Sequence, residues 1–81
     1  MTVTVLLFAG AREAAGADQV SVELADGAVY SDLASELRRG FPQLQRLTAA
    51  ARFAADAGYV DLSDPVDPAA EIALIPPVSG G

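Results

Sequence analysis

Residues 71–81 read Glu71-Ile72-Ala73-Leu74-Ile75-Pro76-Pro77-Val78-Ser79-Gly80-Gly81. The run from Ile72 to Ile75 is aliphatic and too short for a helix, so it predicts a buried strand that ends at the prolines. Proline lacks a backbone N–H and holds the residue before it in extended geometry. We therefore expect a strand of a sheet, followed by a stiff, polyproline-like segment at Pro76 and Pro77 that leads away from the sheet.

The residues after the prolines predict an arm. Gly80 and Gly81 carry no side chains, so they fit a channel that is too narrow for other residues and bend freely inside it. The group that such an arm presents is the α-carboxylate of Gly81. This pattern predicts a folded domain over residues 1–76 and a flexible, extended tail over residues 77–81.

The first part of the chain predicts two paired strands. Thr2 to Val5 alternates between polar and apolar residues, and Leu6 to Ala9 is continuously apolar, which favours a strand whose second half is buried on both faces. Gln19 to Leu24 also alternates, and it predicts a half-buried strand that pairs with the first as a hairpin. The connection between them, residues 10–18, has room for a single helical turn at Ala11 to Ala15.

A helix and further short strands complete the domain. Residues 30–37 have apolar side chains at helical spacing, Ser31 and Asp32 can open the predicted helix, and Gly40 suits its C-terminus. After it we expect a short helical turn at 43–47 and a weak strand at 50–55. A turn at 56–58 then leads to a short strand at 59–60, and a loop at 63–70 leads to the last strand at 71–75. With the last strand beside the first inside the sheet, the order ββαββ gives an α+β domain of the β-grasp type, a mixed sheet with one main helix packed across it.

The composition of the 81 residues argues against several classes of function. A net charge of −6 argues against nucleic acid, whose binding needs a basic patch. The absence of histidine and cysteine removes the usual nucleophile–base pairs, zinc sites and disulfides. We predict no metal site, because Asp61, Asp64 and Asp67 lie in a proline-containing loop without the calcium-loop pattern. The longest apolar runs are far shorter than a membrane span, and we see no signal peptide, so we expect no membrane contact and a cytoplasmic location.

The carboxylate of Gly81 needs activation before it can react. A C-terminal carboxyl group has a pKa of roughly 3.3–3.7, so it is ionised and a poor acyl donor at neutral pH. Adenylation with ATP is the usual activation, and sulfur can then capture the acyl-adenylate to give a thiocarboxylate. This logic predicts a chain that binds no cofactor itself and has two partners: an ATP-using activating enzyme and an acceptor enzyme with a pocket at the end of a narrow tunnel.

Both ends of the chain point to one family. The segment from Ile75 to Gly81 resembles the C-terminus of the small, sulfur-carrying subunit of molybdopterin synthase, the MoaD type. Val5 to Ala9, with the Ala11 to Glu13 segment and Gly16, is similar to that family's first strand and the turn after it. The chain departs from the family in two places: it reads Pro68-Ala69-Ala70-Glu71 where an Asp-Gly-Asp-Glu turn is usual, and it has Asp56 where asparagine is common.

The resemblance implies a ubiquitin-like β-grasp fold and a carrier that is not a catalyst on its own. It implies that Gly81, with Gly80 before it, is adenylated by a MoeB-type adenylyltransferase and converted to a thiocarboxylate. It also implies that the sulfur passes to precursor Z (cyclic pyranopterin monophosphate) in a synthase with a large, MoaE-type subunit, with two carriers on a dimer of large subunits. The product is the dithiolene of molybdopterin, so the implied pathway is molybdenum cofactor biosynthesis.

The predicted partner contacts are an apolar patch and the tail. We expect large apolar residues to line a patch on the surface of the domain, and the residues after it to contact the partners along the tail. The predicted patch consists of Phe53, Tyr59, Ile75 and Pro76, and the predicted tail contacts are Pro77, Val78 and Ser79.

Three alternatives stay open at this point. The same chemistry would serve another pathway, such as thiamine thiazole or amino-acid sulfur. A ubiquitin-like protein modifier would instead form isopeptide bonds with lysines of its targets. An interaction module would have a diglycine without function. Removal of Gly80 and Gly81 separates these classes, because only the interaction module keeps full activity without them.

Overall fold

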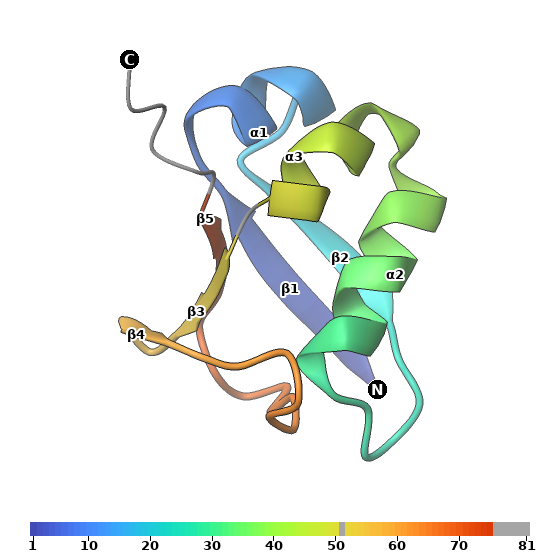
Figure 1. The fold of residues 1–81 in the computed structure, drawn as a ribbon, viewed down its shortest axis with the longest axis vertical. Coiled ribbons are helices and arrows are strands. Elements are labelled where there is room, and N and C mark those ends of the chain that lie inside the picture. Colours follow the sequence, from blue (N-terminus) through green and yellow to red (C-terminus); the bar gives the residue numbers. More distant parts are fainter. Residues whose placement is uncertain (51, 76–81) are drawn as a thin grey trace.

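The computed structural model describes residues 1–50 and 52–75, and it shows a five-stranded sheet with helices on one face (Figure 1). In chain order the elements are β1 (Thr2–Leu7), α1 (Ala9–Ala15), β2 (Gln19–Glu23), α2 (Tyr30–Gly40), the 3-10 helix η1 (Pro42–Leu44), α3 (Gln45–Ala50), β3 (Arg52–Ala55), β4 (Gly58–Tyr59) and β5 (Ile72–Ile75). The predicted order of strands and main helix is confirmed. The predicted boundary between domain and tail, at residues 76 and 77, lies outside the described residues, as does the predicted tail.

β5 lies in the middle of the sheet (Figure 1). The strand order is β2-β1-β5-β3-β4, in which β5 runs parallel to β1 and antiparallel to β3. The remaining neighbours, β1 with β2 and β3 with β4, are antiparallel. Both predicted pairings are therefore confirmed: the first two strands pair antiparallel, and the last strand lies beside the first inside a mixed sheet.

One face of the sheet is buried and the other is open. In β1 the valines and Leu7 point into the core, whereas Thr2 and Thr4 are exposed, as the alternation predicts. The prediction that the second half of this strand is buried on both faces is wrong, because the helices cover only one face. Leu6 is half-buried, and Phe8, just after the strand, is 48% exposed.

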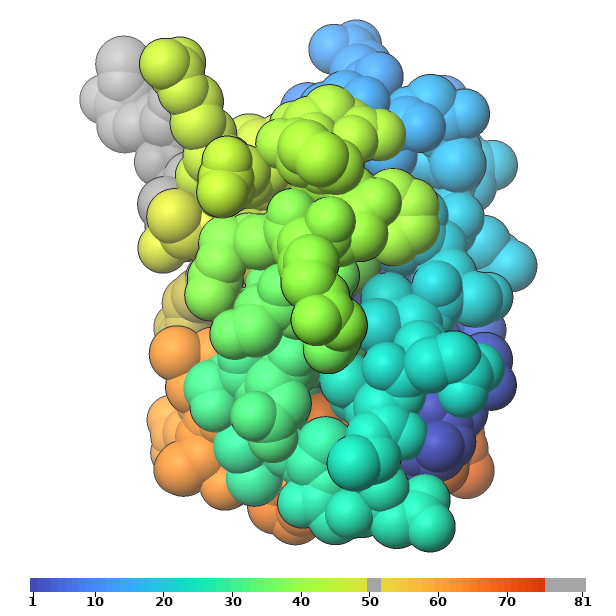
Figure 2. Space-filling model, turned by 90° about the vertical axis from the view of Figure 1, so that its right-hand side faces the viewer, coloured from blue at the N-terminus to red at the C-terminus, as the bar shows by residue number. Residues whose placement is uncertain are grey.

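α2 covers the buried face because one side of the helix is apolar. Its buried residues recur at helical spacing, as predicted: Tyr30, Leu33, Ala34 and Leu37. The carboxylate of Asp32 accepts a hydrogen bond of 2.9 Å from the backbone N–H of Val29 and so stabilises the first turn. Arg38 and Arg39 lie in the last turn, near the negative end of the helix dipole. Figure 2 shows this helical layer from the outside, with α2 in green and η1 with α3 in yellow-green.

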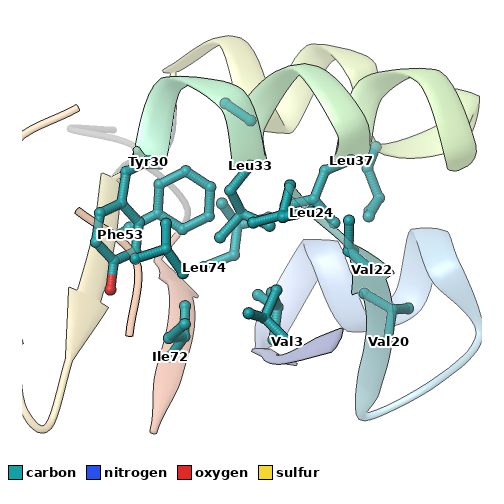
Figure 3. Close-up of a cluster of buried hydrophobic side chains, with 14 of the residues drawn as sticks. Val3, Val20, Val22, Leu24, Tyr30, Leu33, Leu37, Phe53, Ile72 and Leu74 are labelled. Atoms are coloured by element: carbon teal, nitrogen blue, oxygen red, sulfur yellow. The ribbon is translucent and has the colours of Figure 1, made fainter. Parts of the chain in front are cut away.

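The core lies between α2 and the sheet (Figure 3). Leu33 and Leu37 point from α2 toward the sheet. At one end of the core the ring centroids of Tyr30 and Phe53 are 5.6 Å apart. Phe53 is 3% exposed, so the prediction that it lines a surface patch is wrong. The reason is the register: Phe53 pairs with Leu74 across β3 and β5, and both side chains lie on the buried face.

The contrast between Phe53 and Tyr59 gives a matched test of the core. Tyr59 is also aromatic and lies in the neighbouring strand, but it is 61% exposed. We expect Phe53→Ala to lower the free energy of unfolding by about 3–5 kcal/mol, because the truncation leaves a cavity in a closed core. Tyr59→Ala should lower it by about 1 kcal/mol or less, since an exposed contact is lost. Urea unfolding measures both values, and equal losses would show that Phe53 is not a core residue.

The hydroxyl of Tyr30 has a raised pKa. Burial is the main cause, because desolvation disfavours the phenolate, and the negative charges of Asp67, Asp56 and Asp64 add to the effect. In the folded chain the group therefore stays protonated above its ordinary pKa of 10.0. At such pH values the folded chain binds more protons than the unfolded chain, so the stability that this group contributes is complete below about pH 10 and is lost as the pH rises.

This linkage predicts a loss of stability in alkali that depends on Tyr30. Between about pH 9 and about pH 11 the free energy of unfolding should fall in the wild type, and Tyr30→Phe should remove part of that fall. Tyr59→Phe, which removes a hydroxyl from an exposed ring, is the control for the substitution itself. Chemical unfolding at both pH values checks this. Identical slopes for all three chains would contradict the assignment to Tyr30.

Candidate docking face

The open face of the sheet changes from polar to apolar along β1. Thr2 and Thr4 lie at the start of this strand, and Leu6 and Phe8 follow on the same side at its end. β5 runs parallel to β1, so the apolar end of the face is also the end at which β5 finishes with Ile75. The exposed apolar side chains of this face are thus gathered at the end of β5.

Side chains from four strands surround a shallow hollow of about 270 Å³ at this apolar end. The residues that line it, which we call the docking face, are Leu6, Phe8, Ala54, Ala57, Tyr59, Glu71, Ala73 and Ile75. Its large exposed side chains are those of Phe8 and Tyr59. The small side chains in its lining are those of Ala54, Ala57 and Ala73. An exposed apolar surface that is gathered in one place is typical of a site that binds another protein.

Tyr59 is held in position by a neighbour. The guanidinium carbon of Arg52 lies 4.1 Å from the centroid of the Tyr59 ring, which makes a cation–π contact. Both residues lie on the open face, because Tyr59 pairs with Ala54 and Arg52 precedes Ala54 by two positions in β3. Arg52 also pairs with Ile75, the last residue of β5. The contact therefore fixes the rim of the docking face at the end of β5.

The turn between β3 and β4 forms another part of the rim. Asp56 and Ala57 have φ values of 50° and 69°, the left-handed conformation that a two-residue hairpin turn favours. Two hydrogen bonds join Asp56 to Glu71: its N–H donates to the Glu71 carbonyl at 2.9 Å, and its carboxylate accepts from the Glu71 N–H at 3.0 Å. Asp56 and residues 68–71 are the two places where the sequence departs from the family that it resembles. The structure joins these two places beside the hollow.

The docking face contains two of the residues that were predicted to form an apolar patch. Tyr59 and Ile75 both line the hollow. Phe53 does not, because it lies on the opposite face of the sheet. The remaining predicted contact and reaction residues lie outside the described part of the chain and stay predictions: Pro76, Pro77, Val78, Ser79, Gly80 and Gly81.

Sequence reasoning missed Leu6 and Phe8. The continuous apolar run from Leu6 to Ala9 concealed which side chains point to which face. A signal was nevertheless present. In a strand every second side chain points to the same face, so the pattern that begins with Thr2 and Thr4 continues to Leu6 and Phe8. The structure has both residues there.

The described residues offer a surface for binding. Within residues 1–50 and 52–75, no group of three or more acidic side chains is arranged to hold a metal ion. In that same part of the chain, none of the helices has the length and apolar character needed to cross a membrane. The docking face supplies apolar contacts, the acidic side chain of Glu71 and, at its rim, the arginine Arg52, a combination suited to binding a protein.

The chain is similar to known sulfur carrier subunits and to a small archaeal modifier protein. The ThiS family matches residues 5–81. The chain is 37% identical over 83 positions to the molybdopterin synthase sulfur carrier subunit of Chlamydomonas reinhardtii, with 100% of both chains covered. It is 34% identical to the subunit of that name from Arabidopsis thaliana, with 98% of this chain and 82% of the relative covered. SAMP1 from Haloferax volcanii, a small archaeal modifier protein, has a TM-score of 0.84 at 27% identity, with 100% of both chains covered.

These comparisons agree with the expectations from sequence. The ubiquitin-like β-grasp fold is confirmed by the order of the strands and by the likeness to a solved structure. The resemblance to the molybdopterin synthase carrier is confirmed by relatives that match this chain over nearly its whole length. The chain belongs to the ThiS family and is a homologue of the sulfur carrier subunits of molybdopterin synthase.

Proposed function

We propose that this chain is the sulfur carrier of a molybdopterin synthase and that it acts through the carboxyl group of Gly81. The observation that carries the proposal is the position of the docking face, which lies at the end of β5, where the sequence runs on into Pro-Pro-Val-Ser-Gly-Gly. A partner that binds this face has the start of the tail at its own surface. The names of the curated relatives support molybdenum cofactor biosynthesis as the pathway.

The proposed reaction begins with an activating enzyme that uses ATP. A carboxylate oxygen of Gly81 attacks the α-phosphorus, pyrophosphate leaves, and the tail becomes an acyl-adenylate. A sulfur donor then displaces AMP and leaves a thiocarboxylate, in which sulfur replaces one oxygen. In the synthase this sulfur passes to precursor Z, cyclic pyranopterin monophosphate, and water restores the carboxylate of the carrier.

The length of the tail limits where this chemistry can occur. Residues 76–81 follow the last residue of β5, and six fully extended residues span at most about 20 Å. The reacting centre of each partner must therefore lie within about 20 Å of the position that Ile75 takes on the docking face. The terminal glycines suit a narrow channel along that path.

The docking face serves two partners in this proposal, the adenylating enzyme and the large subunit of the synthase. Each must hold the folded domain while the tail reacts, and the docking face is the apolar surface beside the start of the tail. Because both partners use the same face, they bind in turn and not together. An arrangement of two carriers on a dimer of large subunits gives each docking face one large subunit. We place these steps in the cytoplasm.

A protein modifier is the second candidate function. The likeness to SAMP1 at 27% identity favours it, because that protein is named as a modifier. A modifier uses the same activated Gly81 but passes its acyl group to a lysine amine of a target, so the product is an isopeptide conjugate. A sulfur carrier of another pathway, such as thiamine thiazole or amino-acid sulfur, shares the thiocarboxylate and differs only in the acceptor.

The intact mass of the purified chain tests the chemistry at Gly81. Protein from cells that contain the activating enzyme should gain the mass difference between sulfur and oxygen, located at Gly81 by fragmentation. Protein from cells without that enzyme should keep its mass, and a chain without Gly80 and Gly81 should keep its mass in both. Conjugate ladders without the mass change would favour the modifier. Absence of both products under sulfur-replete conditions would end every hypothesis that is based on the tail.

Charged substitutions of the exposed aromatic residues test the docking face. Tyr59→Asp and Phe8→Asp should each weaken binding to the large subunit by about 30-fold or more, because a central aromatic contact is often worth about 2 kcal/mol or more. Gln43→Asp is the control: it adds the same negative charge at an exposed position of η1, which packs with α2 on the helical side of the molecule.

The control variant should keep the wild-type affinity within about twofold. Titration calorimetry measures the three affinities, and thermal midpoints establish that each variant is folded. If all three substitutions weaken binding equally, the added negative charge and not the docking face is responsible.

A further inference from the structure

The positively charged side chain of Arg52 lies at the rim of the largely apolar docking face. Arg52 pairs with Ile75 across β3 and β5, and its guanidinium carbon lies 4.1 Å from the centroid of the Tyr59 ring. A guanidinium that stacks on a ring keeps its in-plane N–H donors available, because the ring occupies only one of its faces. Arg52 is therefore positioned by Tyr59 and still able to donate hydrogen bonds.

Of the other four arginines, two have a carboxylate neighbour, and within the described residues Arg38 and Arg46 are in no ion pair. Arg12 lies 3.3 Å from Asp18, and Arg39 lies 2.6 Å from Glu36. Among the ion pairs of residues 1–50 and 52–75, none includes Arg52. Within the described chain its observed contact is with an aromatic ring, so the guanidinium has donors to offer to another molecule.

A partner that covers the docking face also removes water from Arg52. Burying a guanidinium without an acceptor is strongly unfavourable, so the partner must provide one. A carboxylate matches the planar fork of the guanidinium and forms two charge-assisted hydrogen bonds with it. Arg and Tyr are, in addition, among the residue types that contribute most to the stability of protein complexes.

We propose that Arg52 is a specificity-determining residue that binds a carboxylate of the partner protein covering the docking face. This inference rests on the proposed function, because it takes the large synthase subunit as that partner. The net charge of −6 attracts basic surfaces of any kind. Arg52 adds a local requirement. A partner surface can cover the docking face without burying an unpaired guanidinium only if it has an acidic side chain opposite Arg52.

The position of Arg52 gives this contact a second effect. Because Arg52 pairs with Ile75, the carboxylate that it binds lies beside the residue from which the tail continues. An ion pair here fixes how the domain is oriented on the partner and thus the direction in which the tail starts. Correct orientation matters because the tail spans at most about 20 Å.

Charge reversal with a matched control tests the proposal. Arg52→Glu and Arg46→Glu change the net charge equally, but Arg46 is an exposed residue of α3, which packs with α2. The probe is the large synthase subunit of the same organism. Arg52→Glu should weaken its binding by about 30-fold or more, mainly through faster dissociation, whereas Arg46→Glu should stay within about threefold of the wild type. Arg52→Lys keeps the charge but not the planar fork, and its affinity should fall between these two.

The outcomes separate this inference from the proposed function. Equal effects of the two reversals, or none, would overturn the inference, because Arg52 would act only as a distant charge. Tighter binding of Arg52→Glu, expected if Arg52 held this chain's own terminal carboxylate, would overturn it as well. If the thermal midpoint shows that Arg52→Glu is unfolded, Arg52→Gln takes its place, with an expected loss of about tenfold. A wild-type chain that does not bind the large subunit would instead contradict the proposed function itself.

Discussion

The insertion of β5 between β1 and β3 holds the two halves of this molecule together. The strands β1 and β2 form one half of the sheet, β3 and β4 form the other, and Ile72–Ile75 pair with both. The side chains of this strand are divided as well, because Ile72 and Leu74 enter the core while Ala73 and Ile75 lie on the docking face. Four residues thus provide sheet cohesion, part of the core and part of the binding surface.

The docking face exists because the helices cover only one side of the sheet. A domain of this size has too few residues to cover both, and nothing in the described chain lies over the open side. Such an open face is commonly polar, as it is here at Thr2 and Thr4. Toward the end of β5 it becomes apolar, and Arg52 and Asp56 hold the rim in place. The candidate docking face therefore lies at the end of β5, as the proposed role of a carrier with a reactive terminus requires.

Sequence patterns predicted those elements in which the apolar residues repeat often enough to show which side is buried. Alternation predicted the buried face of the first half of β1 and of β2, and helical spacing predicted α2. β3 is only four residues long and has one large apolar side chain, so its orientation depends on its register with β5, which places Phe53 inside and Arg52 outside. Contacts between distant segments, such as Asp56 with Glu71, have no local signal. The proposed chemistry of the tail was recognisable because it depends on residue types in order and not on a three-dimensional arrangement.

The central place of β5 also governs when the domain can form during synthesis. Residues 72–75 leave the ribosome after the other four strands, yet the sheet closes only when they enter it, through contacts between positions as distant as Val5 and Ile72. Contacts of this range slow folding, and until they form β1 and β3 each have an unpaired edge that favours aggregation. A chain interrupted before Ile72 would have neither a closed sheet nor a docking face. Under the proposed function, the order of translation thus makes a completed fold the condition for presenting the tail to the activating enzyme.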